Sequence, residues 1–228
     1  MPNSIHLTAA DGFVLPAYLA RPSGTPKGAV VVIQEIFGIN SHIRSVADGY
    51  AAAGYLAVAP DMFHRVQPGV DLGYSPEDIQ AGIALKAAAE ALGVPVLMLD
   101  VQAAVAYAAA QAGKVGTVGY CWGGLLSWRA ACLVQGLAAS VTYYGGGMTA
   151  AAEVARTPRV AVLSHFGERD HGIALDTVRA FAQAHLAVDV RLYPADHGFN
   201  CDQRGAYDAP AASLARERSL AFFAEHLV

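Results

Sequence analysis

Residues 119–124, with the sequence GYCWGG, constrain the fold of this chain more than any other segment. They follow the short apolar run 114–118 and precede the stretch 125–135, which has the composition of a helix. A cysteine therefore stands at a sharp strand-to-helix turn, with a glycine two residues before it and another two residues after it. Such a turn strains its central residue and leaves no room for side chains at the flanks, so glycine is needed there. The pattern predicts a nucleophile elbow, with Cys121 where serine is more usual.

An elbow holds its central side chain at the edge of a sheet and at the N-terminus of a helix. The unpaired N–H groups and the helix dipole at that place favour an anion, and the thiolate is the reactive form of cysteine. The alternative is that Cys121 is a small buried side chain between ordinary turn glycines, since free cysteine is often buried and inert. The rest of the chain has to decide between these two interpretations.

Strand and helix patterns alternate from residue 29 onward. Continuous apolar runs such as AVVVIQ at 29–34 are typical of strands that are covered on both faces. The predicted strands are 4–8, 13–19, 29–34, 55–59, 114–118, 138–144, 160–165 and 188–193, and the predicted helices are 42–53, 76–91, 98–112, 125–135, 172–186 and 210–226. This order predicts an α/β fold, with a mostly parallel central sheet, helices on both faces and an antiparallel N-terminal hairpin at one edge. We expect a single domain over residues 1–228.

Local signals mark several boundaries between these elements. Ser41 and Ser75 are predicted helix N-caps, and a proline follows Ser75 at the first helical position. Residues 93–95 contain a glycine and a proline and are predicted to separate two helices. The segment 61–75 is long and irregular, and such segments are often functional in compact domains.

The composition excludes several classes of protein. A chain of 228 residues that is 54% hydrophobic can bury a full core, and its net charge of −4 provides no basic surface for nucleic acid or an anionic membrane. Three cysteines predict no disulfide framework and favour the cytoplasm. The first ten residues lack the pattern of a signal peptide, and the apolar stretches are shorter than a membrane span. We expect a cytoplasmic monomer with no nucleic acid or membrane partner.

Three candidate catalytic residues follow three different predicted strands. Cys121 follows the strand before the elbow, Asp170 follows 160–165, and His197 follows 188–193. In open parallel sheets, working residues collect at the carboxyl ends of strands, and the chain order nucleophile, acid, histidine is that of an α/β-hydrolase triad. In these roles His197 takes the thiol proton, and Asp170 fixes the imidazole tautomer and stabilises its positive form.

Each of these residues also has a plainer interpretation. Asp170 is alternatively a surface carboxylate or a helix cap, with Glu168 or Asp176 as the acid. His197 competes with seven other histidines, among them His165 and His171. Three suitable residue types after three strands in the right order together favour the triad.

Glu35 directly follows the predicted strand 29–34 and faces the same end of the sheet as the elbow. It is either a partly solvated acid at a strand end or an acid that hydrogen-bonds the resting thiol and accepts its proton. Its loop is also the expected source of an oxyanion donor, so we predict that the backbone N–H groups of Ile36 and Trp122 form the pair.

Together these motifs resemble the dienelactone hydrolase family. The matching segments run in family order over nearly the whole chain: QEIFG at 34–38, APDMF at 59–63 with PG at 68–69, GYCWGG at 119–124, YYG at 143–145, GERD at 167–170, HGF at 197–199 and FF at 222–223. The resemblance implies a cytoplasmic α/β-hydrolase without a cofactor that opens a lactone, which for the name-giving members is carboxymethylenebutenolide (dienelactone), converted to maleylacetate.

The resemblance also implies roles for individual residues. Cys121 matches the nucleophile, Asp170 the acid, His197 the base and Glu35 the carboxylate paired with the thiol. Arg204 is similar to an arginine that holds the substrate carboxylate. Tyr144 and Phe37 lie in matching segments and are predicted to contact the substrate.

The sequence departs from the family at one place. The name-giving enzymes have a second substrate-binding arginine between the loop at Asp61 and the elbow, but no arginine occurs here between Arg65 and Arg129. Lys86 is the only nearby cation before Lys114. A paralogous thioesterase or acyltransferase therefore remains an alternative, as does a non-catalytic ligand-binding protein on the same fold. We predict no metal site, because the cysteines and histidines show no ligand spacing such as Cys-x-x-Cys.

Overall fold

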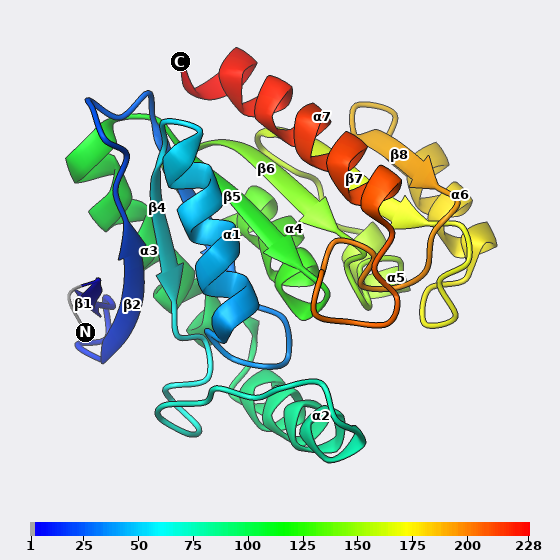
Figure 1. Cartoon of the computed structure of the whole chain (residues 1–228), viewed down its shortest axis with the longest axis horizontal. Helices are drawn as coiled ribbons and strands as arrows, with labels where there is room; N and C mark the ends of the chain where they lie inside the picture. Colours follow the sequence, from blue (N-terminus) through cyan, green and yellow to red (C-terminus); the bar gives the residue numbers. More distant parts are fainter. Residues whose placement is uncertain (1–2) are drawn as a thin grey trace.

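The computed structural model describes residues 3–228. Eight strands form a sheet in the order β1-β2-β4-β3-β5-β6-β7-β8 (Figure 1). The strands are β1 (Ser4–Thr8), β2 (Val14–Ala20), β3 (Ala29–Ile33), β4 (Leu56–Pro60), β5 (Val115–Tyr120), β6 (Leu137–Tyr143), β7 (Ala161–Gly167) and β8 (Asp189–Tyr193). The hairpin β1–β2 and the β2–β4 pair are antiparallel, and all other neighbours are parallel. The predicted mostly parallel sheet with an N-terminal hairpin at its edge is confirmed.

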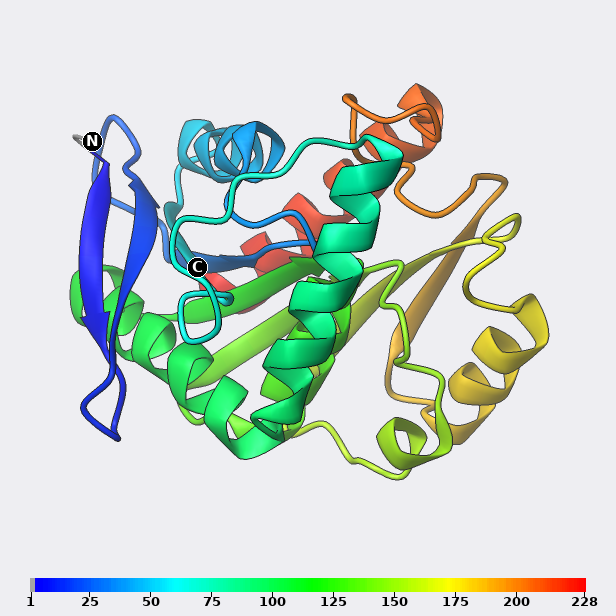
Figure 2. The ribbon, with the colours of Figure 1, turned by 90° about the horizontal axis from the view of Figure 1, so that it is seen from below.

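Helices cover both faces of this sheet. One face carries α1 (Ser41–Ala52) and α7 (Ala209–Leu227), and the other carries α3 (Val94–Ala112), α4 (Trp122–Leu133), α5 (Ala151–Val154) and α6 (Leu175–Ala184), as Figures 1 and 2 show together. Every residue of β3, β4 and β5 is buried. These central strands are continuously apolar rather than alternating because neither of their faces meets water.

Helix α2 (Pro76–Ala91) belongs to neither layer. It lies beyond the carboxyl end of β4, at the end of the sheet where the predicted catalytic residues collect (Figure 1). Ser75 caps it as predicted, in a reciprocal pair of hydrogen bonds with Asp78. A Cβ added at Gly82 would overlap the carbonyl oxygen of Ile36, so this glycine lets α2 approach the loop that follows β3. Helix α2 therefore covers one side of the candidate site.

Several predicted boundaries were wrong: α4 begins at Trp122 rather than at residue 125, and α6 spans Leu175–Ala184 rather than 172–186. Asn40 rather than Ser41 caps α1, because its side-chain oxygen accepts the hydrogen bond from the third helical N–H group. Helix α3 begins at Val94 rather than at residue 98, since Pro95 sits in the first turn, where its missing N–H costs nothing. Gly93, with φ +89°, provides the turn that separates α2 from α3. The four-residue helix α5 has no counterpart in the prediction.

Helix α3 has 19 residues and, by length and composition alone, is apolar enough to cross a membrane; it is the one such helix in residues 3–228. The helix packs against β3, β4 and α4, and its buried residues include Leu97, Val101 and Ala104. Packing in the core accounts for its apolar character.

Candidate active site

Cys121 occupies the turn between β5 and α4, as the sequence predicted. Its φ is +53°, a value that is rare outside glycine, and it is the N-cap residue of α4. A Cβ added at Gly119 would overlap the carbonyl oxygen of Gly123, and one added at Gly123 would overlap the carbonyl oxygen of Ile33. The Cys121 N–H donates to the carbonyl oxygen of Tyr143 at 3.0 Å, which fixes the turn to β6. The side chain is partly exposed, so solvent and small molecules can reach it.

Asp170 and His197 are brought together by the loops after β7 and β8. Asp170 Oδ2 lies 2.7 Å from His197 Nδ1, and Asp170 Oδ1 accepts hydrogen bonds from the backbone N–H groups of Gly172 and Ile173 at 2.8 and 3.1 Å. The Asp170 side chain is 1% exposed, so its carboxylate is held in a fixed position.

The competing acids and histidines lie elsewhere. Glu168 and Asp176 are exposed, and so is His171. His165 is buried below the site, where it hydrogen-bonds other side chains, and burial lowers its pKa to about 3. Of the sequence candidates, Asp170 and His197 form the acid–histidine pair.

His197 also interacts with Cys121. Burial of the ring disfavours its positive charge, but the negative charge of Cys121 and the hydrogen bond with the Asp170 carboxylate outweigh burial and raise the pKa of His197 to about 10. The pKa of His197 is raised because negative charge on both sides of the ring stabilises the protonated imidazolium. Cys121 therefore contributes to the raised pKa of His197.

We expect the His197 ring to remain protonated through neutral pH and to lose its charge only as the pH rises through about 10. In Cys121→Ala the negative partner is gone, so the pKa of His197 should fall toward its ordinary value of 6.5. NMR titration of the imidazole measures both values, with Cys132→Ala as the matched control because Cys132 is buried at the far end of α4. Identical His197 titrations in Cys121→Ala and in the native protein would contradict the coupling.

Glu35 lies directly after β3 and is completely buried. The hydrogen bonds found among residues 3–228 include none between Glu35 and the Cys121 thiol, so the paired carboxylate that the resemblance implies is not seen. Its Oε1 instead lies 3.5 Å from Arg204 Nη1, and its Oε2 has no hydrogen-bond partner within residues 3–228. A guanidinium is a stronger partner for a carboxylate than a neutral thiol is, which explains the difference.

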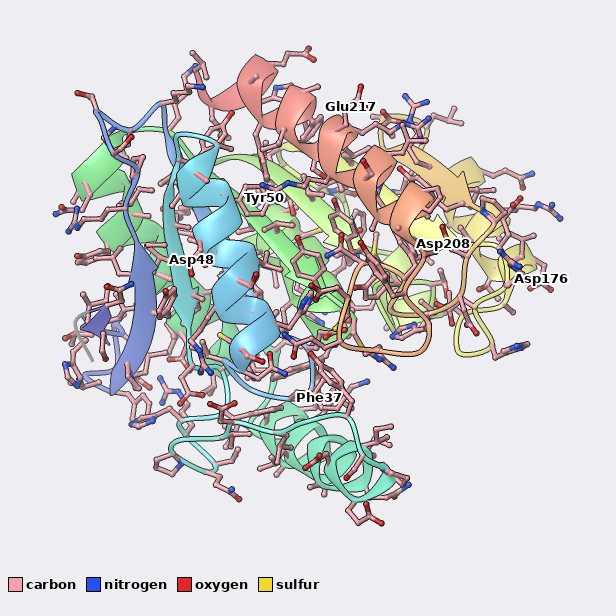
Figure 3. The ribbon with its side chains drawn as sticks, viewed as in Figure 1. Phe37, Asp48, Tyr50, Asp176, Asp208 and Glu217 are labelled. Carbon is pink, nitrogen blue, oxygen red and sulfur yellow. The ribbon has the colours of Figure 1, made fainter. Side chains whose placement is uncertain are left out.

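Arg204 reaches the site from the loop that follows His197. Its guanidinium carbon lies 5.7 Å from the centre of the Phe37 ring and 5.9 Å from that of Tyr74, and its side chain is 21% exposed. Phe37 is buried and packs edge-on against Tyr74 at 4.7 Å; Figure 3 labels it between the ends of the strands and α2. The Phe37 ring therefore helps to position the Arg204 guanidinium. Tyr74, at the end of the irregular segment 61–75, is a site residue that the sequence did not single out.

Tyr144 follows β6 with a positive φ of +38°. Its ring lies 5.0 Å from that of His197, and its buried hydroxyl lacks a hydrogen-bond partner in the described part of the chain. Burial, followed by the charge of Glu35, raises the pKa of the Tyr144 phenol well above its usual value. The hydroxyl is therefore a neutral donor available to a bound molecule.

The backbone N–H groups of Ile36 and Trp122 have no acceptor among the hydrogen bonds of residues 3–228. Both predicted oxyanion donors are therefore unpaired within that part of the chain.

The Trp122 indole stacks on Phe63 with ring centres 4.9 Å apart, and its Nε1 donates to Glu90 Oε1 at 2.7 Å. Glu90 also accepts from Arg129 at 2.8 Å, so it ties α2 to the elbow helix. Glu90 was missed in the sequence because an acid on an exposed-looking helix carries no signal of its partner.

Comparisons with known proteins show the family to which the chain belongs. The sequence model of the dienelactone hydrolase family matches residues 15–227. A carboxymethylenebutenolidase of Pseudomonas putida is 32% identical over 233 residues, which cover 98% of this chain and 97% of that protein. A Synechocystis protein provisionally given the same name is 36% identical over 228 residues, which cover 92% and 91% of the two chains.

Solved structures place the chain in the same group. A Klebsiella pneumoniae protein, provisionally named a dienelactone hydrolase, superposes with a TM-score of 0.82 at 29% identity, covering 98% of both chains. An esterase of Pyrococcus furiosus has the same fold, with a TM-score of 0.68 at 15% identity over 99% of this chain and 92% of its own. The predicted α/β-hydrolase fold is confirmed, and the chain belongs to the dienelactone hydrolase family of ester-hydrolysing enzymes.

Proposed function

We propose that this protein is a cysteine-dependent hydrolase of a small carboxylic ester or lactone, with the opening of dienelactone to maleylacetate as the type reaction. The observation that carries the proposal is the Asp170–His197 pair at 2.7 Å, coupled to a cysteine on a strained elbow. A cysteine without a catalytic role requires neither a strained elbow nor an oriented imidazole beside it.

In the proposed reaction, the Cys121 thiolate attacks the carbonyl carbon, and the carbonyl oxygen becomes an oxyanion. The N–H groups of Ile36 and Trp122 donate to that oxygen. The tetrahedral intermediate then expels the alkoxide, which takes a proton from His197, and an acyl-thioester remains on Cys121. Neutral His197 next removes a proton from water, and the water oxygen attacks the thioester. Collapse of this intermediate releases the thiolate and the carboxylic acid, which loses its remaining proton to solvent, and protonated His197 is restored. A substrate hydroxyl or carbonyl can bond the free Tyr144 hydroxyl during these steps.

Arg204 is the residue we propose for binding a substrate carboxylate. Arg65, the nearest arginine before α2 in the chain, is already paired with Asp100 and Asp11 at 2.8 Å each and is not available. A substrate carboxylate would compete with Glu35 for the guanidinium. We therefore favour a substrate with a single carboxylate close to the reacting ester.

Arg204→Ala should raise KM for an acidic lactone about 10-fold or more, because a charge-assisted hydrogen bond is lost, while KM for a neutral ester should change little. Steady-state kinetics on a matched acidic and neutral pair measure the difference. Arg204→Lys serves as the control, since it keeps the charge without the planar fork and should lie between the two. Equal effects on both substrates would remove the role of Arg204 as a carboxylate anchor.

Turnover of dienelactone, a neutral nitrophenyl ester and an acyl thioester tests the reaction class. The proposal expects hydrolysis of the lactone and the ester. Activity confined to the thioester, or seen only with an added acyl acceptor, would favour the thioesterase or acyltransferase alternative.

We also propose that the protein acts as a cytoplasmic monomer in one domain, and its three free cysteines suit a reducing compartment.

A further inference from the structure

Three potential metal ligands meet beside the catalytic residues, and the reaction proposed above gives no role to two of them. Glu35 comes from the loop after β3, His42 from the first turn of α1, and Cys201 from the loop after His197. One ligand atom from each residue lies within 4.8 Å of the others, and all three residues are buried, with exposed fractions of 0, 3 and 0%.

Two polar atoms of this cluster are buried without a partner. Glu35 Oε2 and His42 Nε2 make no hydrogen bond to any group in residues 3–228. Leaving such an atom unpaired costs about 1–3 kcal/mol, so folded proteins rarely do so without a bound water or ion. The orphaned atoms are a carboxylate oxygen and an imidazole nitrogen, both of which are metal ligands.

We propose that Glu35, His42 and Cys201 form a binding site for a divalent cation of the zinc class. Zinc accepts mixed oxygen, nitrogen and sulfur donors, whereas magnesium and calcium require oxygen ligands. Three protein ligands leave a fourth position for water. In a tetrahedral zinc site neighbouring ligand atoms are about 3.5 Å apart, so the three side chains need to close by at most about 1.3 Å.

Residues around the cluster provide the outer contacts that such a site uses. His42 Nδ1 lies 3.4 Å from Asp202 Oδ1, an arrangement that orients the ring and leaves Nε2 for the cation. Cys201 Sγ lies 3.2 Å from the Tyr74 hydroxyl, which also accepts a hydrogen bond from Asn40 at 3.0 Å. When the thiol loses its proton to a bound metal, the Tyr74 hydroxyl can donate to the sulfur.

A bound cation would compete with Arg204 for the Glu35 carboxylate. Zinc with the Glu35 carboxylate and the Cys201 thiolate is neutral overall, but Arg204 already lies 3.5 Å from Glu35 Oε1. The cation and the guanidinium therefore compete for one carboxylate. Binding of the cation draws Glu35 away from Arg204 and depends on expelling the Cys201 proton, so it strengthens as the pH rises.

The sequence pattern did not reveal this site. Its prediction of no metal site relied on ligand spacing, and residues 35, 42 and 201 become neighbours only when β3, α1 and the loop after β8 meet. Cys121, which the sequence offered as the reactive thiol, is not one of the three.

The test is a titration with zinc by calorimetry, and with cadmium by its thiolate charge-transfer absorbance, in the Cys121→Ser background. That background removes the catalytic thiol, so the result does not depend on the proposed hydrolase activity. We expect one zinc per chain, no response to magnesium, and loss of both signals on adding Cys201→Ser, with folding checked by circular dichroism.

Two further variants have opposite expected effects and retain all three ligands. Asp202→Asn should weaken zinc binding about 10-fold through the outer contact to His42, whereas Arg204→Leu should strengthen it by removing the competing charge. Absence of zinc binding, binding unchanged by Cys201→Ser in a folded protein, or a shift of both other variants in the same direction would overturn the proposal.

Discussion

Replacing Cys121 with alanine should abolish turnover, with a loss of at least about 10⁴-fold in kcat, while the fold is kept. The alanine removes the only atom that attacks the substrate, and the oxyanion donors alone give little rate. The side chain is small and only partly buried where it packs against the core, so the free energy of unfolding should change by less than about 1 kcal/mol. Steady-state kinetics and denaturant unfolding measure the two quantities.

Cys121→Ser should also retain little activity. Its hydroxyl is a far weaker acid than a thiol, so serine would not provide the negative charge that raises the pKa of His197. Cys132→Ser is the matched control, because it makes the same change on the same helix away from the site and should remain active. A fully active Cys121→Ser enzyme would contradict thiol-specific activation.

Gly119→Ala should cost about 3 kcal/mol or more of unfolding free energy and should remove activity with it. Its Cβ would overlap the carbonyl oxygen of Gly123 and lie 2.7 Å from Ser127 Oγ, so β5 and α4 would have to move apart. Such a shift displaces Cys121 from His197. Denaturant unfolding followed by fluorescence of the tryptophans on α4 reports the loss.

Gly146→Ala is the control for this substitution. Gly146 lies in the loop after β6, and a Cβ added there meets no atom within 4 Å. Its stability should stay within about 0.5 kcal/mol of the native protein. If the two alanine variants were equally stable, the close packing of the elbow would not be what requires glycine at position 119.

The elbow could be read from the sequence because its constraint is local. A glycine on each side of Cys121 follows from the backbone geometry of six residues, and no distant contact is needed to predict it. The order of Cys121, Asp170 and His197 was informative for a similar reason, since parallel strands bring their carboxyl ends to one edge. The strands of the central sheet were predicted because burial on both faces leaves a continuous apolar run.

Side-chain partners across long separations could not be predicted in this way. Glu35 was expected to hydrogen-bond the thiol, but the hydrogen bond found for its side chain in residues 3–228 is with Arg204, 169 residues further along the chain. Glu90 looks like an ordinary helix acid until α2 packs on the Trp122 indole. The predicted start of α3 was too late because Pro95 favours a helix break, although the first turn of a helix accepts proline. Such contacts depend on how the elements meet.

Several predictions from the sequence stay predictions. These are the single domain, the monomeric state, the cytoplasmic location and the roles of the individual site residues. Each concerns a property that the fold and the family leave open, and the cysteine dependence of the reaction is the most consequential of them.

Stepwise alkylation of Cys121 tests that dependence most directly. Iodoacetamide should modify Cys121 first, because Cys132 and Cys201 are buried, and mass spectrometry identifies the modified residue. Hydrolysis of an ester and a lactone is measured on the same samples. If hydrolysis depends on Cys121, activity falls in proportion to the alkylated fraction of Cys121 and reaches zero when one equivalent has reacted. Activity that survives complete alkylation of Cys121 would contradict it.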